Sequence, residues 1–595
     1  MTYTPDMSQF SENPHICTCG ELVPGDVLVV DGAKRFAVLD ASPADEEHVR
    51  LTLRAVHGGP DFHAVHLRTG PVEVAGERVD PQCVPLIVPT GPGVDFWDGD
   101  RMSVLDAAQL EGAERHFVRR EGMWHPEPGS RHPEPGTAEE DSGTGSPLPD
   151  DAMRALMARD PRAIVCRLDP VPRPGRSGRR VVVTGVGAIS PLGGDAATTW
   201  QGLLDGRSGL QRLDGEEFES LGVRIAAPAA VEPAERLPRA RARTMSRSAQ
   251  FAVLAAREAW ADAGFAQDEV TEGTLDARRV GVSIGTIIGG APVMVDADRT
   301  LAERGQRHVS PHTAPMIVPS GAAAQVAIDT GARAEARTVV SACASGTEAI
   351  GQAIDRIRDG HADVMVAGGT EAVIIPAIMA SFTSMRALSP GTDGPEKASR
   401  PFDTARDGFV VGEGAGLLVL ESEDHARARG ARIYCEAAGW GISADAFHMA
   451  TPRPDAGGVI DALHKALDDA GAKPDEVMHI NAHATATGSG DAAEALALRA
   501  VFGERPAMPV TAPKGAMGHL QGAAGGVEAV AAVLTLHHGV VPPTVGCEEP
   551  DDSLGLDVVT GAPRPLPESG DVALSNSFGF GGHNAVLALR RTHPA

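Results

Sequence analysis

Residues 338–354, TVVSACASGTEAIGQAI, join an apolar run typical of a β-strand to a helix of small residues, and Cys343 stands at the junction. A thiol at a helix N-terminus faces unpaired backbone N–H groups and the positive end of the helix dipole, which favour the nucleophilic thiolate. The small residues that follow Cys343 leave room for a bulky acyl group. A buried structural cysteine is the competing interpretation, and further reactive residues elsewhere in the chain would favour catalysis.

Two histidines lie at similar strand–helix junctions. His483 is followed by small residues at 484–488, and His519 lies five residues after Lys514, ahead of a glycine-containing apolar helix. In α/β proteins, ligands bind at the carboxyl ends of strands, where such loops gather. We therefore expect His483, His519 and Lys514 to complete a site around Cys343.

A metal site is the competing functional interpretation of these histidines. They are not spaced i,i+4, no HExxH motif is present, and the isolated pair Cys17 and Cys19 lacks further ligands at zinc spacing. We expect no metal.

Near the C-terminus, SFGFGG (577–582) forms a glycine-rich turn between two strand-like runs. Glycines let backbone N–H groups approach a ligand closely, which suits the stabilisation of an oxyanion. The turn is not GxGxxG, so a nucleotide site is not predicted.

Composition sets limits on partners and location. The net charge of −27 argues against non-specific nucleic-acid binding. Seven cysteines in 595 residues do not form a disulfide framework, and a reduced nucleophile fits the cytoplasm. Neither a signal peptide nor a membrane span is expected.

The N-terminal third differs from the rest of the chain. Short alternating runs between residues 20 and 120 predict a small β-barrel of five or six strands, within a domain at 1–123. GDVLVVDGAKRFAVLDA (25–41) resembles the SH3-like barrel of translation elongation factor P proteins, from which only the fold is inferred. Carrier docking, support of a dimer and regulation stay open as its role. Residues 124–178 are rich in proline, glycine and acidic residues and predict a linker with a short helix at 150–160.

From Arg180 onward, strands and helices alternate in two similar sets, which predicts an α/β body with halves at 179–425 and 426–595. Cys343 comes from the first half and both histidines come from the second. We expect the site to lie between the two halves.

The chain from about Arg180 to Arg591 resembles the β-ketoacyl synthases of the thiolase superfamily, most closely the carrier-protein-dependent type II elongating enzymes of fatty acid and polyketide synthesis. The motifs that carry the resemblance are RRVVVTGVGAISPLG, SACASGTEA, VAGGTEA, SRPFDTARDGFVVGEGAG, SADAFHMATPRPDAGG, NAHATATGSGD, KGAMGHLQGAAGGVE and NSFGFGGHN. Their order and spacing match the family. The resemblance implies a duplicated thiolase-like fold with five layers, α/β/α/β/α.

The resemblance also implies a decarboxylative Claisen condensation and assigns roles to residues. Cys343 accepts the acyl group, His483 and His519 bind the thioester carbonyl of the malonyl unit, and Lys514 supports the histidines. Phe580 gates the cysteine, and the backbone N–H groups of Cys343 and Phe580 form the oxyanion hole. The resemblance places the acids Asp491, Glu494 and Glu528 around Lys514, and it places Thr485 and Thr487 close behind the reactive groups.

The chain departs from the family in one loop and at one strand position. HATATG (483–488) stands where the family usually has HGTSTP, so that Ala484, Ala486 and Gly488 replace Gly, Ser and Pro. His583 stands where many relatives carry Thr. These changes reshape a loop and remove no catalytic group.

The implied partner is an acyl carrier protein that brings acyl and malonyl groups on its own phosphopantetheine, so no bound cofactor is expected. Acyl carriers are acidic, and the resemblance places their docking surface on Arg239, Arg241, Arg243 and Arg247. A homodimer and a heterodimer with a cysteine-less, chain-length-factor-like partner are both open. Pocket depth is expected to depend on residues across the dimer interface, near Ile287, Ile288 and residues 374–384. The alternatives to condensation are a non-elongating acyltransferase and a non-catalytic partner or scaffold.

Overall fold

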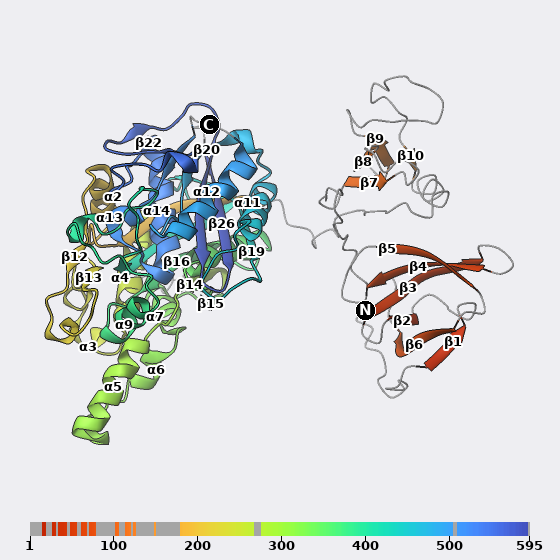
Figure 1. Ribbon diagram of the computed structural model, residues 1–595. Helices are drawn as coiled ribbons and strands as arrows, with labels where there is room; N and C mark the ends of the chain where they lie inside the picture. Colours follow the sequence, from red (N-terminus) through yellow and green to blue (C-terminus); the bar gives the residue numbers. More distant parts are fainter. Residues whose placement is uncertain are drawn as a thin grey trace. The chain divides into compact units, whose positions relative to one another are not determined.

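The computed structural model divides the chain into two compact units, Met1–Gly175 and Arg176–Ala595. It describes residues 179–266, 275–503 and 508–592, and in the first unit the backbone of ten short strands. Helices α5 (Ala291–Arg304) and α6 (Thr313–Ile317) project from the body of the second unit (Figure 1).

The first unit contains two antiparallel sheets. Six strands pair in the order β1 (His15–Thr18), β6 (Pro71–Arg78), β2 (Asp26–Val30), β3 (Lys34–Pro43), β4 (His48–Ala55) and β5 (Asp61–Leu67). Four more pair in the order β10 (Leu148–Pro149), β9 (Met123–Pro126), β8 (Glu114–Arg120) and β7 (Arg101–Leu105). Closure into a barrel stays a prediction, β9 and β10 fall largely in the stretch expected to be a linker, and the helix expected at 150–160 lies outside the described residues.

The second unit is built on one 11-stranded sheet with a repeated pattern. The order is β15 (Glu335–Val339), β14 (Val280–Gly285), β16 (Val364–Glu371), β18 (Gly414–Ser422), β11 (Val181–Ile189), β19 (Cys435–Ala444), β26 (His583–Arg591), β25 (Val572–Gly579), β20 (Val477–Asn481), β21 (Pro509–Thr511) and β23 (Asp557–Val558). In each half, three parallel strands are followed by two antiparallel ones: β15, β14, β16, β18 and β11 correspond to β21, β20, β25, β26 and β19. The halves join between β11 and β19 through only two residue pairs.

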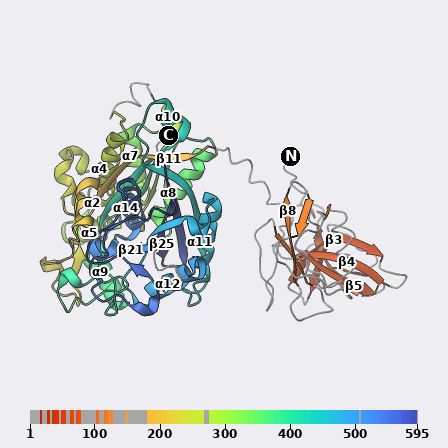
Figure 2. The same ribbon diagram turned by 90° about the horizontal axis from the view of Figure 1, so that it is seen from above.

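Helices cover both halves. On the first half, α4 (Arg247–Asp262) packs against β11, β16 and β18, and α7 (Gly321–Thr330) packs against α4. On the second half, α11 (Gly457–Ala470) packs against β19 and β26, and α12 (Gly488–Phe502) packs against α11. Between them lie α8 (Ser345–Arg358) and α14 (Ala524–His538), which contact each other and strands of both halves. Figure 2 shows α14 between α4 and α11.

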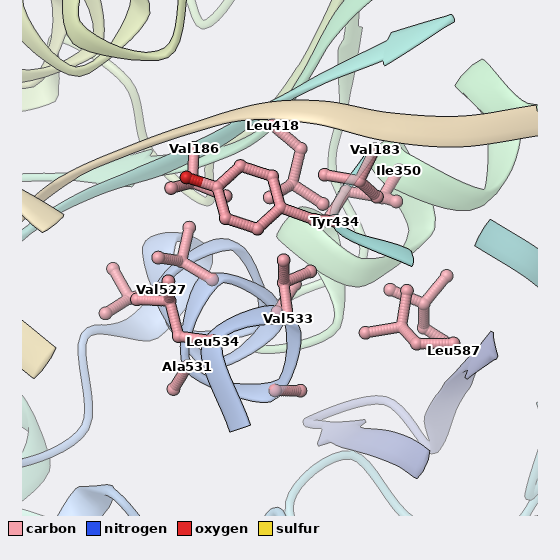
Figure 3. Close-up of a cluster of buried hydrophobic side chains, with 14 of the residues drawn as sticks. Val183, Val186, Ile350, Leu418, Tyr434, Val527, Ala531, Val533, Leu534 and Leu587 are labelled. Carbon is pink, nitrogen blue, oxygen red and sulfur yellow. The ribbon is translucent and has the colours of Figure 1, made fainter. Parts of the chain in front are cut away.

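Helix α14 lies at the centre of the core because its sequence is apolar on nearly every face, as befits a helix surrounded by protein. Every residue from Ala524 to Leu536 is buried. Its side chains Val527, Val533 and Leu534 gather with those of both halves, including Val183, Leu418 and Leu587, in one cluster (Figure 3).

The remaining helices are α2 (Ala196–Leu204), α3 (Arg239–Ala242), α9 (Pro376–Ser384), α10 (Glu423–Ala428) and α13 (Lys514–Met517), and the remaining strands are β12 (Gln211–Arg212), β13 (Ile225–Ala227), β17 (Val411–Gly412), β22 (Val540–Val541) and β24 (Arg564–Pro565). The α/β prediction for this unit agrees with these elements. Among the residues that the structure describes, no helix has the length and apolar character needed to span a bilayer.

Glycines allow the central helices to touch the sheet and each other through their backbones. A Cβ atom added at Gly526 of α14 would lie 2.2 Å from the Gly416 carbonyl oxygen of β18 and 2.5 Å from the Gly369 nitrogen of β16. A Cβ added at Gly346 of α8 would lie 2.7 Å from the Gly526 nitrogen. This contact fixes the N-terminus of α8, and with it Cys343, against the segment that leads from His519 into α14.

We expect Gly526→Ala to destabilise the protein by about 3 kcal/mol, because the added methyl meets backbone that cannot move aside. The melting temperature should fall by about 3 °C. Differential scanning fluorimetry of purified protein measures the change. Gly222→Ala is the matched control, since its added Cβ meets only Thr383 Cγ2 at 3.6 Å; equal melting temperatures for the two variants would contradict the expectation.

Candidate active site

Cys343 is presented by a tight turn between β15 and α8. Ala342 adopts a φ of 50°, in the left-handed region that residues with a Cβ seldom occupy. Ser345 holds the turn: its hydroxyl donates to the Ala342 carbonyl at 2.6 Å and accepts from the Ser341 N–H at 3.0 Å. The thiol is buried, with 6% of the residue exposed.

The hairpin between β25 and β26 approaches Cys343 closely. A Cβ added at Gly579 would lie 2.8 Å from the Ser341 carbonyl oxygen and 3.0 Å from the Cys343 nitrogen, so this contact requires glycine. The next residue, Phe580, directs its backbone N–H at the Cys343 sulfur, as does the N–H of Cys343 itself. The Phe580 ring is partly exposed and lies 6.5 Å from the ring of Phe382.

Burial raises the pKa of the Cys343 thiol to about 11, although the charge of Lys514 and the two backbone N–H groups act in the opposite direction. The sequence-based expectation of a thiolate is therefore wrong for the free protein. The helix terminus supplies donors, but the desolvation of a buried sulfur outweighs them. At neutral pH the cysteine is a thiol that must lose its proton as it reacts.

His483 and His519 lie side by side, with ring centroids 5.4 Å apart and planes at 87°. Burial, reinforced by the nearby charge of Lys514, holds the pKa of both imidazoles well below the ordinary value, so both rings are neutral. The Nδ1 atom of His519 accepts the Gln521 backbone N–H at 3.2 Å, which leaves its proton on Nε2. That Nε2–H has no partner among the described residues and is available to a ligand.

Lys514 is buried behind the histidines and pairs with Glu528. Burial raises the pKa of Glu528 to about 7, and Lys514 opposes that shift. The Asn481 amide donates to the Glu528 backbone carbonyl at 2.7 Å and so ties β20 to α14. Of the three acids expected around Lys514, only Glu528 forms an ion pair with it in the part of the chain that the structure describes.

Glu494, from α12, holds the loop that carries His483. Its carboxylate accepts the backbone N–H groups of His483 at 2.9 Å and Ala484 at 2.8 Å, and the Asn576 side-chain amide at 2.9 Å. Burial raises the pKa of Glu494. Asn576 thereby joins the hairpin strand β25 to the histidine loop, a role that no sequence pattern indicated.

Asp491 acts one turn earlier on α12. It accepts the backbone N–H groups of Ala486 at 3.1 Å and Phe402 at 2.8 Å. Burial raises the pKa of Asp491 to about 7. In the same loop the hydroxyls of Thr485 and Thr487 lie 3.0 Å apart.

Ala484 and Ala486, two residues at which the chain departs from the family, have strained backbone conformations. Ala484 has a φ of 22° and Ala486 a φ of 65°, which a glycine would adopt without a steric penalty. The carboxylates of Glu494 and Asp491 hold these conformations, because each binds an N–H group within the strained segment.

The predicted reactive residues open onto one cavity of about 400 Å³. Cys343, His483, His519, Phe580, Thr485 and Thr487 line it, whereas Lys514 and Glu528 lie behind its wall. His583, at the departure from the family's Thr, is exposed at the start of β26. No group of three or more His, Cys, Asp or Glu residues suited to a metal was found among the described residues.

The four arginines expected to dock a carrier do not share one environment. Arg241 pairs with Asp329, and Arg247 pairs with Glu413 at 2.7 Å and Glu232 at 2.6 Å. Arg239 and Arg243, on α3 and at its C-terminus, are exposed and form no ion pair within the described residues. Two of the four thus serve internal contacts.

A duplicated α/β fold with a cysteine and two neutral imidazoles in one cavity defines a thiolase-like acyl-transferring enzyme. Residues 178–426 match the family model "Beta-ketoacyl synthase, N-terminal domain", and residues 434–548 match "Beta-ketoacyl synthase, C-terminal domain". The chain belongs to the β-ketoacyl synthase family. The predicted thiolase-like α/β fold of this part of the chain is thereby confirmed.

The individual proteins to which the chain is similar are also 3-oxoacyl-[acyl-carrier-protein] synthases or ketosynthases. The chain is 43% identical over 415 residues to the 3-oxoacyl-[acyl-carrier-protein] synthase 2 of Staphylococcus aureus strain COL, covering 69% of this chain and 98% of that protein. Two solved structures align over 70% of this chain and their full length: the ishigamide ketosynthase/chain length factor, with 35% identity and a TM-score of 0.64, and a type II polyketide synthase acyl-carrier protein in complex with its ketosynthase, with 32% identity and a TM-score of 0.63. The activity is that of a 3-oxoacyl-[acyl-carrier-protein] synthase, an acyltransferase that catalyses carrier-dependent condensation in fatty acid or polyketide synthesis.

The raised pKa of Cys343 predicts an unusual pH dependence of alkylation. With a pKa of about 11, the thiolate fraction is small at neutral pH and grows about tenfold for each pH unit between 7 and 9. The rate of iodoacetamide labelling, read by mass spectrometry on the peptide that contains Cys343, should rise in the same proportion. The same peptide in urea-denatured protein is the control and should level off above about pH 8.5. A plateau below pH 8 in the folded protein would show that the thiolate is stabilised after all.

Proposed function

We propose that Cys343 is the acyl-accepting nucleophile of this condensing enzyme. In the first half-reaction its sulfur attacks the thioester carbonyl of an acyl carrier, and the backbone N–H groups of Cys343 and Phe580 stabilise the oxyanion. The carrier thiolate departs and takes up the proton that the cysteine lost. Because the Cys343 thiol keeps its proton until it reacts, that proton leaves as the S–C bond forms and moves to the departing carrier sulfur.

In the second half-reaction a malonyl carrier loses CO2, and the electron pair of the broken C–C bond forms an enolate on the thioester. His483 and His519, as neutral N–H donors, hold the enolate oxygen. The enolate carbon attacks the acyl-Cys343 carbonyl, the Cys343 thiolate leaves and is protonated, and a 3-oxoacyl carrier is released. Burial, together with the charge of Lys514, keeps both rings neutral by disfavouring imidazolium.

The observation that carries this proposal is one cavity in which the Cys343 sulfur faces two backbone donors and the unpartnered Nε2–H of His519 lies beside His483. A non-elongating acyltransferase would need no pair of donors for an enolate. A scaffold subunit would need no cysteine in that cavity. Glu494, Asp491, Thr485 and Thr487 act by shaping the loop of His483, and Phe580 acts as the gate at the cavity mouth.

For the carrier, we propose docking at Arg239 and Arg243, whose charges are free to meet an acidic partner. One structural relative is a carrier protein in complex with its ketosynthase, and another is a ketosynthase/chain length factor, which supports a carrier partner and a paired subunit. The second subunit, identical or cysteine-less, is proposed to meet the edge strand β15, beside which Val340 is 55% exposed. We also propose that the domains divide at 1–123, 124–178, 179–425 and 426–595. The reduced state that Cys343 needs supports a cytoplasmic location as a further part of the proposal.

Variants at the two reactive groups should separate the half-reactions. Cys343→Ala should abolish acyl-enzyme formation, since no sulfur remains. His519→Ala should lower malonyl decarboxylation by about 100-fold or more, because a positioned donor to the enolate is lost, and should affect acyl loading less. Intact-mass spectrometry measures loading, and released CO2 measures decarboxylation. Unchanged decarboxylation by His519→Ala would refute the role assigned to that histidine.

Charge reversal tests the docking surface. The double variant Arg239→Glu with Arg243→Glu should raise the KM for an acyl carrier about tenfold at low salt, with a smaller difference at high salt because the ions screen the attraction. Arg278→Glu with Arg427→Glu, two exposed arginines elsewhere on the unit, is the matched control. Equal KM values for the two double variants would remove Arg239 and Arg243 from the docking surface.

A further inference from the structure

Gln521 is a buried polar residue in the wall of the active-site cavity. It begins the short turn Gln521–Ala523 between His519 and α14, is 3% exposed and adopts a φ of 54°. Its backbone N–H serves the Nδ1 atom of His519. Its side-chain nitrogen, Nε2, has no hydrogen-bond partner in the described part of the chain.

Such atoms are few in this cavity. Among the described residues that line it, a buried side-chain polar atom without a partner occurs at His483 Nδ1, His519 Nε2 and Gln521 Nε2. The first two belong to the histidines that the proposed function uses. A buried hydrogen-bond donor without a partner is destabilising. We therefore expect the substrate to bring an acceptor atom to the side-chain nitrogen of Gln521.

The surroundings of Gln521 indicate which part of the substrate it meets. The next residue, Gly522, packs against the loop after β14, since a Cβ added there would lie 2.8 Å from the Ile287 nitrogen and 2.6 Å from a Glu371 carboxylate oxygen. Glu371 in turn accepts the Ile287 N–H at 2.5 Å and fixes this loop. Ile287 is one of the residues on which the depth of the acyl pocket is expected to depend.

Phe409 gives the cavity an apolar surface next to His519. Phe409 lines the cavity, and its ring lies 5.6 Å from that of His519 and 5.2 Å from that of Phe382. Phe409 belongs to a cluster with Ile288 and Ile374. The Phe409 ring suits the methylene groups of an acyl chain, and the Gln521 amide and the His519 imidazole are polar groups that line the cavity with it.

We propose that the Gln521 side-chain amide donates a hydrogen bond to an oxygen on the acyl chain carried by Cys343, a carbonyl or hydroxyl close to the thioester. The inference rests on the proposed function and extends it to the substrate class. A saturated chain leaves the amide buried against methylene groups without an acceptor. A site built around a hydrogen bond discriminates strongly against an analogue that lacks the partner atom. The enzyme therefore prefers oxygen-bearing acyl groups to saturated ones.

The test compares acyl groups of equal length. Wild-type protein and Gln521→Met, which keeps the side-chain length and removes the donor, are incubated with 3-oxobutyryl, 3-hydroxybutyryl and butanoyl carrier protein, and acylation of Cys343 is followed by intact mass. The wild type should favour one or both oxygen-bearing groups, and Gln521→Met should shift that ratio toward butanoyl at least about tenfold. Because the ratio is taken on one preparation, a loss of folded protein cancels. Gln352→Met, a half-buried glutamine of α8 outside the cavity lining, is the control and should leave the ratio unchanged.

The outcomes separate this inference from the one on which it rests. An unchanged ratio in Gln521→Met, with all three groups loading normally, overturns the role of Gln521 alone. A loss confined to malonyl decarboxylation also overturns it, since the amide would then serve the malonyl thioester. Failure of wild-type Cys343 to accept any of the three groups overturns the proposed function and this inference together.

Discussion

The whole catalytic unit depends on direct backbone contact at its centre, where α8 and α14 meet each other and the sheet through glycines. A side chain at Gly526 or Gly346 would separate elements that must touch. Because α8 begins two residues after Cys343 and α14 begins five residues after His519, this contact sets the distance between nucleophile and imidazole. The glycine backbone atoms that pack the two helices together therefore also position the reactive side chains.

Around that contact, burial governs the electrostatics of the site. Lys514 is the buried cation behind the cavity wall, and its pairing with Glu528 does not remove its effect on the two imidazoles, whose pKa values it lowers. Burial and this charge act in the same direction on the histidines, which stay neutral and can donate from nitrogen. They act in opposite directions on the thiol, and burial prevails. The two neutral imidazoles can therefore donate hydrogen bonds in the free protein, whereas the Cys343 thiol becomes a thiolate only as it reacts.

Much of this arrangement could be predicted from sequence, because strand-to-helix junctions and glycine-rich turns are local signals. Cys343, His483, His519 and Phe580 were expected to share a site and line one cavity. The protonation state of Cys343 could not be predicted, since it depends on three-dimensional burial. Nor could the internal pairing of Arg241 with Asp329 and of Arg247 with Glu413, since these partners are remote in sequence. In the sequence, Gln521 is one polar residue in a run of small residues. Its proposed role could not be predicted, because that role depends on the burial of its amide in the cavity wall.

The matching strand patterns of the two halves relate the position of the nucleophile to that of one imidazole. Cys343 follows β15 and precedes α8, while His519 follows β21 and precedes α14, so the nucleophile and one imidazole occupy corresponding connections on either side of an internal pseudo-twofold axis. Two identical halves would bring identical groups to that axis, two thiols or two rings. Joining them in a single polypeptide breaks the symmetry, and each copy of the connection is free to carry a different reactive group. Neither half contains the machinery for carbon–carbon bond formation by itself.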